Sequence, residues 1–376
     1  MKFLHTADWH IGKKLHDFSL FDEQWDAFNQ IEKIALQEKV DAIVIAGDLY
    51  DRSVPSEEAV KTLNQMLIQL NLKDHFPILA INGNHDSAVR LDNGSDWFKA
   101  ANFNLVTKLK DAFTPIVIQD TQFFLLPYFE LPTAREYFND SEIHTLETAM
   151  RKVIDKMQTK FDPELHHVLV AHYFAAGSSH TDSETKVEVG GLDAVPLDLM
   201  ERFDYVALGH LHSRNALHHP TIQYSGSPVK FSVSEAHDEK GVWIVDTDLP
   251  VDKMAQWKPL TQLNDIQILQ TDFATLTTSD FYQKIPDDDF VAVELTDQQI
   301  IPNVMNRLRE YYPRIISFKR QNGRMEIEQE KRREIKQQSP IELLQDFFED
   351  TTGHGLSTAQ LKFASEILTK VERSDE

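Results

Sequence analysis

Several short apolar segments of this chain end in side chains that can bind a metal ion. Residues 42–46 are apolar and mostly β-branched and lead into Gly47 and Asp48. This pattern predicts a strand that is buried on both faces and delivers a carboxylate at its carboxyl end. In α/β sheets, functional groups gather at that edge. The same arrangement recurs with Asp8 and His10 after residues 2–6, Asn84 and His85 after 78–81, His172 after 167–171, and His210 and His212 after 205–208.

The candidate metal ligands follow predicted strands and are more numerous than one ion needs. They are Asp8, His10, Asp48, Asn84, His172, His210 and His212. We expect two ions that share one carboxylate, with Asp48 as the bridge. The chain has no cysteine, so the ligands are nitrogen and oxygen, a mixture that favours manganese over iron or zinc and disfavours calcium. Two ions roughly 3.5–4 Å apart can clamp a phosphoryl group and lower the pKa of a bound water.

His85 stands beside this ligand set. An imidazole titrates near neutral pH, so His85 could give a proton to a leaving alkoxide. In an extended backbone, residues two apart such as Asp8 and His10 point to the same side and could reach one cation. A single pair of this kind would also fit a solvated loop, so the prediction depends on the combination of strand ends.

Helical and strand patterns alternate along the chain and supply the elements that would hold these side chains. Apolar residues at three- and four-residue spacing predict helices over 22–39, 56–70 and 146–157. Short strands are predicted between 101 and 126. A chain of 376 residues predicts two or three domains, and the main one should mix helices and strands.

The composition limits the compartment and the partners. Met1 and Lys2 open directly on a predicted strand, and no apolar run approaches the eighteen or so residues of a membrane span. We therefore expect a cytoplasmic protein without membrane contact. The formal net charge is -22, with 38 Lys and Arg against 60 Asp and Glu. This balance argues against tight DNA binding by the chain alone and is otherwise explained by solubility.

The ligand motifs together resemble those of a known superfamily, the calcineurin-like metallophosphoesterases. The motifs are Asp8-x-His10, Gly47-Asp48-x-x-Asp51, Gly83-Asn84-His85-Asp86, His172 and Gly209-His210-x-His212. The stretches MKFLHTADWHIGK, GGLDAVPLDLMERFDYVALGHLH and IQYSGSPVKFS closely resemble the bacterial SbcD nuclease subunits, and this similarity covers most of residues 1–250. The resemblance implies an α/β (α+β) fold in which a two-sheet β-sandwich is flanked by helices, with metals at the strand ends.

The resemblance also implies roles for the candidate residues. One manganese ion would be held by Asp8, His10, Asp48 and His212, and the other by Asp48, Asn84, His172 and His210. His85 would assist catalysis without binding metal. Asp51 and Asp86 are expected to orient histidines, with no assignment of which histidine each serves.

Three further parts follow the expected nuclease domain of residues 1–260. Residues 261–328 predict a small α+β unit, at the place where SbcD-like nucleases carry a domain that caps the DNA groove. Residues 329–338 predict a charged linker, and 339–376 predict two amphipathic helices, each opened by a capping-box pattern. These helices would bury their apolar faces on a partner or on the same chain, and the resemblance implies that residues 339–371 bind an SbcC-like ATPase.

We therefore expect a hydrolase, a manganese-dependent DNA phosphodiesterase. The resemblance implies double-strand exonuclease and hairpin- or end-opening endonuclease activity in DNA repair, recombination and replication. It also implies a homodimer within a heterotetramer with the ATPase, associated with the nucleoid. One alternative is a metal-dependent phosphomonoesterase or protein phosphatase, because Gly47-Asp48-x-x-Asp51-Arg52 resembles the protein phosphatase motif. A non-catalytic scaffold for an ATPase is the other, and the complete ligand set disfavours it.

Overall fold

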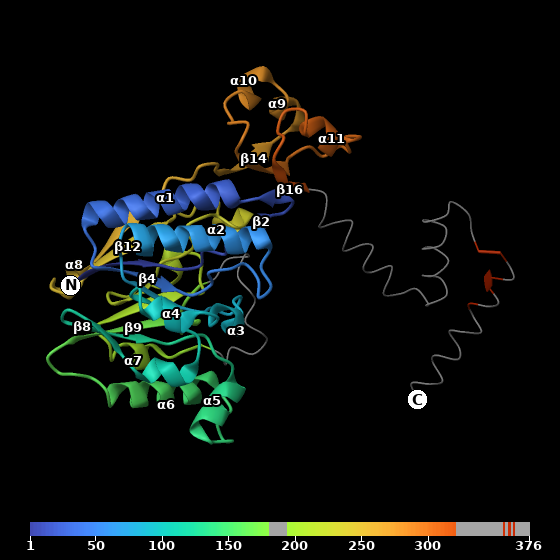
Figure 1. Ribbon diagram of the computed structural model, residues 1–376. Helices are drawn as coiled ribbons and strands as arrows, with labels where there is room; N and C mark the ends of the chain where they lie inside the picture. The colour runs from blue at the N-terminus through green and yellow to red at the C-terminus, as the bar shows by residue number, and fades with distance from the viewer. Residues whose placement is uncertain (180–193, 321–355, 358–359, 362–363, 365–376) are drawn as a thin grey trace. The chain divides into compact units, whose positions relative to one another are not determined.

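The structure, a computed structural model, describes residues 1–179, 194–320, 356–357, 360–361 and 364 (Figure 1). The chain divides into two compact units. The first comprises Met1–Ile268, Ile285–Ala292 and Tyr312–Ser317, and the second comprises Leu269–Lys284, Val293–Tyr311 and the described residues from Phe318 onward. Among the described residues, no helix is both long and apolar enough to cross a membrane.

A six-stranded sheet forms one layer of the first unit. Its order is β13 (Ala255–Pro259), β12 (Gly241–Asp246), β1 (Lys2–Thr6), β4 (Ala42–Ala46), β5 (Ile78–Ile81) and β6 (Phe103–Val106). Strands β1, β4, β5 and β6 are parallel, whereas β12 and β13 are antiparallel to their neighbours. Every residue of β4 is buried, as predicted for a strand covered on both faces. Because parallel strands end at one edge, the segments after β1, β4 and β5 emerge together.

A five-stranded sheet forms the second layer. Its order is β11 (Ile222–Tyr224), β10 (Tyr205–Gly209), β9 (His166–His172), β8 (Thr121–Leu125) and β7 (Ile116–Ile118). Strands β8 to β11 are parallel, and β7 is an antiparallel edge strand. Gly209 pairs with His172 at the carboxyl ends of β10 and β9. The predicted ligand segments of this sheet therefore also leave it side by side.

The two sheets pack face to face, and helices cover their outer faces (Figure 1). Helices α1 (Phe21–Glu38) and α2 (Glu57–Ile68) cover the six-stranded sheet, and α5 (Leu131–Phe138) and α6 (Leu146–Gln158) cover the five-stranded one. In β4, Val44 and Ala46 pack between the sheets, whereas Ile43 and Ile45 pack toward α1 and α2. This alternation follows the two-residue period of a strand. It confirms the predicted sandwich of two sheets flanked by helices.

Shorter elements complete the first unit. They are β2 (Lys14–Leu15), β3 (Phe18–Ser19), η1 (Gln69–Lys73), α3 (Ala88–Leu91), α4 (Ser95–Lys99), η2 (Leu109–Phe113), α7 (Leu197–Met200), η3 (Arg214–Ala216), η4 (Val233–Glu235) and α8 (Val251–Met254). The long predicted helices are confirmed within a residue or two, apart from the stretch after α2. There the predicted helix continues as the wider turn η1.

The second unit contains the short helices α9 (Phe273–Leu276), α10 (Ser279–Tyr282) and α11 (Val304–Leu308). A three-stranded sheet has the order β14 (Ile266–Thr271), β15 (Phe290–Leu295) and β16 (Ile315–Arg320), and each of these strands has residues in both units. Residues 321–328 of the predicted α+β unit, the predicted linker 329–338 and nearly all of 339–376 lie outside the described residues. The domain boundaries therefore stay a prediction.

Candidate metal centre

The ends of five strands bring the predicted ligands to one rim of the first unit. Asp8 and His10 follow β1, Asp48 follows β4, Asn84 follows β5, His172 ends β9, and His210 and His212 follow β10. All of them are buried except Asn84, which is half-buried. The N–H of Asp8 donates to Gly47 O at 3.1 Å and that of His10 to Asp48 O at 3.0 Å. These bonds tie the loop after β1 to the loop after β4.

One group of candidate ligands surrounds His10 and His212. The Nε2 atoms of the two imidazoles lie 3.1 Å apart, and His10 Nε2 lies 3.5 Å from Asp48 Oδ2. Asp8 completes the group, because one donor atom each of Asp8, His10 and His212 lie within 4.8 Å of one another. Imidazoles that face one another beside carboxylates form a donor set that fits a divalent transition-metal ion.

A second group surrounds Asn84. Its Oδ1 lies 3.0 Å from His172 Nε2 and 3.0 Å from His210 Nδ1. His172 Nε2 also lies 3.3 Å from Asp48 Oδ2 and 3.9 Å from Asp8 Oδ1. Asp48 Oδ2 is therefore close to an imidazole of each group. The structure thus brings the expected ligands together, with both Asp48 and Asp8 close to His172. Which ion each residue would bind stays a prediction.

The backbone of this rim is not extended, contrary to the sequence expectation for Asp8 and His10. Asp8 (φ 54°), His10 (φ 43°), Asp48 (φ 50°) and His210 (φ 96°) all have left-handed backbone conformations. For residues other than glycine such conformations cost on the order of 1–3 kcal/mol each and cluster at functional sites. The ligands thus reach the site through tight turns, not through the alternation of a strand.

Two glycines leave the space that the ligands need. A Cβ atom on Gly83 would collide with Asp48 Oδ1. A Cβ atom on Gly209 would collide with Ala46 O and lie 2.8 Å from His172 Nδ1. Any larger residue at these positions would displace a candidate ligand.

Burial and neighbouring charges divide the histidines into two classes. Burial lowers the pKa of His210 to about 3, and the nearby His172 adds to this effect. Burial likewise lowers the pKa of His10 and that of His212. For His172, burial is outweighed by the negative charge of Asp48, which raises the pKa of His172 to about 9. Neutral imidazoles are what a metal ion requires, so His172 would release a proton when an ion binds.

His172 is oriented by a backbone group that sequence reasoning missed. Its Nδ1 lies 2.8 Å from Ala46 O, so the ring donates there and directs Nε2 toward Asp48. Histidine ligands commonly have their second nitrogen fixed in this way. A carbonyl contact between residues so far apart leaves no mark in the sequence.

His85 lies at the edge of the first group. Its backbone N–H donates to Asp48 Oδ1 at 2.9 Å, and its Nδ1 lies 2.9 Å from Asp51 O. Its ring stands edge-on to that of His10, with 4.8 Å between centroids. The carboxylate of Asp51 pairs with Lys13 at 3.0 Å. Asp51 therefore holds the His85 ring through its backbone carbonyl. Its carboxylate pairs with Lys13 and also lies within 4.8 Å of donor atoms of His10 and His85.

The carboxylate of Asp86 accepts hydrogen bonds from backbone N–H groups, not from a histidine. Its carboxylate accepts N–H groups from Leu49 at 3.1 Å, Tyr50 at 2.9 Å and Gly83 at 3.0 Å. Burial raises the pKa of Asp86 to about 6, and the negative charge of Asp48 adds to the rise. Asp86 thus fixes the turns that carry the ligands of β4 and β5.

Glu235 and Lys240 lie behind His212 and were not predicted as site residues. Glu235 Oε1 lies 3.7 Å from His212 Nδ1, and Lys240 Nζ lies 2.5 Å from Glu235 Oε2. Both side chains are buried. The polar stretch after β11 resembles an ordinary loop in the sequence, so no pattern there predicts a buried ion pair.

Comparison with protein families places the chain in a class. Residues 1–214 match the family described as calcineurin-like phosphoesterase. Residues 262–352 match the family described as type 5 capsule protein repressor C-terminal domain. The chain therefore belongs to the calcineurin-like phosphoesterases.

Two relatives narrow the class. The chain is 32% identical over 365 residues to the SbcD subunit of the nuclease SbcCD in Staphylococcus epidermidis, across 96% of both chains. It is 31% identical over 372 residues to the SbcD subunit of the same nuclease in Staphylococcus saprophyticus, across 98% of both. Within the calcineurin-like phosphoesterases it thus belongs to the SbcD family of nuclease subunits. A solved dimetal phosphatase from Danio rerio, 11% identical with a TM-score of 0.40 over 65% of this chain and 91% of its own, is too remote to bear on the site.

Proposed function

We propose that this chain is the metal-dependent DNA nuclease subunit of an SbcC/SbcD-type complex, in which it hydrolyses phosphodiester bonds. The observation that carries this proposal is the position of Asp48, whose Oδ2 lies 3.5 Å from His10 Nε2 and 3.3 Å from His172 Nε2. A carboxylate between two sets of imidazoles suits two ions that act on one phosphate. Relatives named as nuclease subunits align over nearly the whole chain and support DNA as the substrate.

Each group of ligands would hold one ion. We assign Asp8, His10, Asp48 and His212 to the first position, and Asp48, Asn84, His172 and His210 to the second. Ions bound there supply a water activated for attack and neutralise charge on the phosphate. The donors are nitrogen and oxygen alone, which favours manganese over iron or zinc. The N–H of His210 donates to Asp8 Oδ1 at 3.0 Å, so the two positions are also joined through the backbone.

His85 would act on the phosphate or on the leaving group. Because its Nδ1 donates to Asp51 O at 2.9 Å, the tautomer is fixed and Nε2 is the atom that can take part in proton transfer. The protonated ring could donate from Nε2 to a non-bridging phosphate oxygen or to the departing 3′ oxygen. His85 is therefore the proposed catalytic residue that does not bind metal.

Action on double-stranded ends, on hairpins and with an ATPase partner extends this proposal. The names of the relatives, which describe them as subunits of a nuclease, support assembly with a partner chain. We propose that residues 339–371 bind an SbcC-like ATPase, two nuclease and two ATPase chains forming a heterotetramer in DNA repair, recombination and replication. Nearly all of this segment lies outside the described residues.

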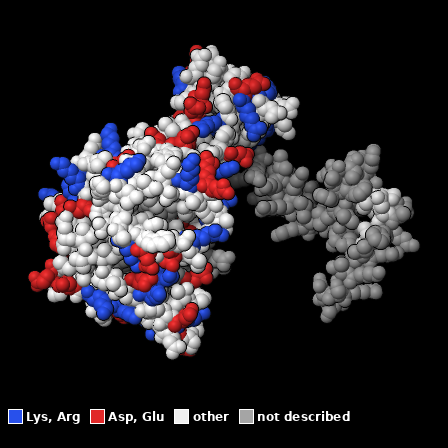
Figure 2. Space-filling view, in the orientation of Figure 1, with Lys and Arg blue, Asp and Glu red and all other residues white. Residues whose placement is uncertain are grey.

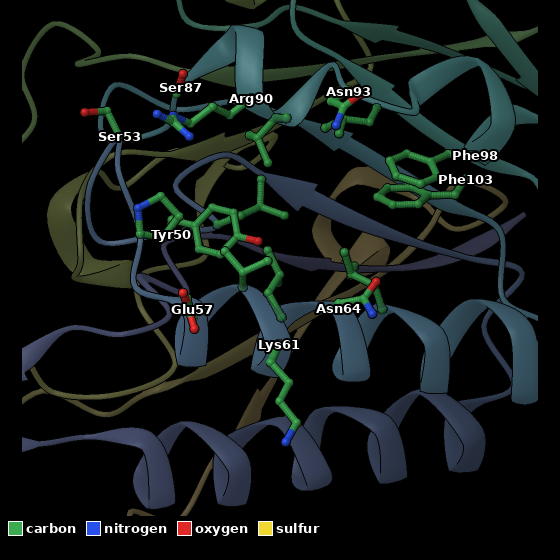
Figure 3. Close-up of a pocket in the computed structure, with 17 residues that line it drawn as sticks. Tyr50, Ser53, Glu57, Lys61, Asn64, Ser87, Arg90, Asn93, Phe98 and Phe103 are labelled. Carbon is green, nitrogen blue, oxygen red and sulfur yellow. The ribbon is translucent and has the colours of Figure 1, made fainter.

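A homodimer is supported by an apolar face on the first unit. Val60 of α2, Val89 of α3 and Trp97 of α4 are 45%, 85% and 82% exposed, and Figure 2 shows a largely uncharged area over α2 and α4. A pocket of about 560 Å³ opens between α2 and α3, with Tyr50, Phe98 and Phe103 among its walls (Figure 3). Exposed apolar side chains beside a hollow are typical of protein interfaces. We propose that a second copy of this chain covers this face.

The acidic composition fits a nuclease that shares DNA binding with its partner. On the face in Figure 2, the acidic and basic residues that the structure describes are interspersed. We propose a cytoplasmic location. Association with the nucleoid would depend on the complex, because this chain alone carries a net charge of -22. The alternative, a phosphomonoesterase or protein phosphatase, is less supported, because it accounts for neither the C-terminal family match nor the relatives.

The test is cleavage of end-labelled duplex and hairpin DNA by the purified chain in Mn²⁺, with His85→Ala alongside and p-nitrophenyl phosphate as a second substrate. We expect the wild type to cut DNA and the variant, with its bound metal intact, to cut it far more slowly. Hydrolysis of the monoester without any cleavage of DNA would favour the phosphatase. Equal cleavage by both proteins would remove His85 from the mechanism.

A further inference from the structure

The segment after β11 contacts the candidate ligand His212 at both its ring and its backbone. At the ring, Glu235 Oε1 lies 3.7 Å from His212 Nδ1, on the side of the imidazole away from the Nε2 atom that faces His10. At the backbone, His212 O accepts from Lys240 Nζ at 2.9 Å and from Ser227 N at 3.1 Å. The same residue is therefore held at both its ring and its carbonyl group.

The two side chains that contact His212, Glu235 and Lys240, form a buried ion pair. Glu235 is 0% and Lys240 2% exposed, and Lys240 Nζ lies 2.5 Å from Glu235 Oε2 and 3.0 Å from Ser227 Oγ. A pair of charges removed from water is costly unless its geometry is fixed and its hydrogen bonds are satisfied. This pair is fixed in that way, directly behind a candidate ligand.

An aromatic ring, that of Phe231, also contacts His212. Phe231 stands edge-on to both His10 and His212, with centroid distances of 5.3 and 5.4 Å. The N–H of Phe231 donates to Glu235 Oε1 at 3.3 Å. Glu235 thus also holds the backbone of Phe231, whose ring contacts both imidazoles.

The contacts fall on one half of the centre. His212 belongs with His10 and Asp8, whereas His172 is oriented by Ala46 O at 2.8 Å, a contact made by the backbone of β4. The two halves are thus supported by different parts of the fold. We propose that Glu235 and Lys240 are positioning residues that set the occupancy of one of the two metal positions, the one at His10 and His212. This inference rests on the proposed two-metal function.

The test compares manganese binding by Glu235→Gln and by the wild type. The side chains have nearly the same size, so the variant removes the charge behind His212 and keeps an oxygen there. Titration calorimetry and electron paramagnetic resonance count the ions and report whether two of them are magnetically coupled. We expect two ions in the wild type. In the variant one ion should bind unchanged and the other about 10- to 100-fold more weakly, as for other residues that orient a histidine ligand, and the coupled signal should be lost.

Glu239→Gln is the matched control. Glu239 lies four residues further on and pairs with Arg214 at 2.9 Å, but its side chain is 52% exposed. It should bind two ions as the wild type does. The proposal is overturned if Glu235→Gln also binds two ions with wild-type affinity, or if both affinities fall together. A wild type that binds two ions but does not cut DNA would instead contradict the proposed function and leave this inference standing.

A second variant keeps the test decisive if the lone lysine left by Glu235→Gln prevents folding. The double variant Glu235→Met, Lys240→Met leaves no unpaired buried charge and should restore a cooperative thermal transition. We expect this folded protein still to bind only one ion tightly. Two tightly bound ions in the double variant would show that the pair serves the fold alone.

Discussion

The Nε2 atom of His172 lies 3.3 Å from Asp48 Oδ2, while Nδ1 of the same ring lies 2.8 Å from Ala46 O. Ala46 is the last residue of β4, so the strand that delivers Asp48 also orients an imidazole delivered by the other sheet. The geometry of the candidate centre therefore depends on how the two sheets pack against each other. A change that displaces Asp48 should affect both groups of ligands.

Asp48→Asn should remove binding at both positions. The amide is nearly the same size but lacks the charge that faces His10 and His172, and the bridging role needs a carboxylate. We expect less than one manganese ion per chain after gel filtration, measured by elemental analysis, and a rate of DNA cleavage lowered at least about 100-fold. Asp155→Asn, at a surface ion pair with Arg202, is the control. Retention of two ions by Asp48→Asn would exclude Asp48 as the bridge.

Gly83→Ala should disturb the centre through a single methyl group. The new Cβ would collide with Asp48 Oδ1, and a shift of about 1 Å in a reacting group can cost about 100-fold in rate. Gly177→Ala is the comparison, because a Cβ there meets nothing within 4 Å and only its left-handed backbone is penalised, by about 1–2 kcal/mol. We expect manganese affinity to fall in the first variant alone. Unchanged affinity in Gly83→Ala would mean that the loop can move aside.

The sequence predicted the strands and the ligand types because both depend on local patterns. A run such as residues 42–46 is apolar throughout, which indicates a central strand, and parallel strands must end at one edge. The identity of the residues after those strands then brings Asp8, Asp48 and Asn84 to that edge. This much follows from periodicity, and the two-sheet fold followed from the resemblance.

The contacts that fix the centre could not be predicted, because they join distant parts of the chain or depend on turn geometry. Ala46 O, Glu235 and Lys240 lie far in sequence from the histidines that they support. The left-handed conformations of Asp8 and His10 depend on the turn that the rest of the site imposes. Asp51 was a good candidate for orienting a histidine, but the atom that does so is its carbonyl oxygen.

His5 should make folding stability depend on pH. It is fully buried, with Nε2 3.2 Å from Leu208 O and Nδ1 3.1 Å from Tyr205 OH, and burial lowers its pKa from 6.5 to about 3. Between those values the unfolded chain binds a proton that the folded protein refuses. The free energy of unfolding should therefore fall as pH falls from about 6.5 toward 3, by at most about 1.4 kcal/mol per pH unit from this residue.

Urea unfolding in EDTA from pH 7.5 to 4.5 would measure this effect. His5→Gln should lose stability overall but show a shallower pH dependence than the wild type, by about one proton. His75→Asn is the control, because His75 is exposed and already has a left-handed backbone (φ 65°) that asparagine tolerates. It should keep the wild-type slope. Parallel slopes for His5→Gln and the wild type would show that His5 is protonated in the folded state.

The isolated chain should bind DNA weakly. Affinity for duplex DNA at physiological salt depends on Lys and Arg displacing counterions, whereas this chain has 38 of them against 60 acidic residues. We expect a Kd for a fluorescent duplex, measured by anisotropy in Ca²⁺ to prevent cleavage, no tighter than about 1 μM, the range of non-specific binding. Adding the ATPase partner should tighten it, because the partner would supply the missing basic surface. Nanomolar binding by the chain alone at this salt concentration would contradict the prediction.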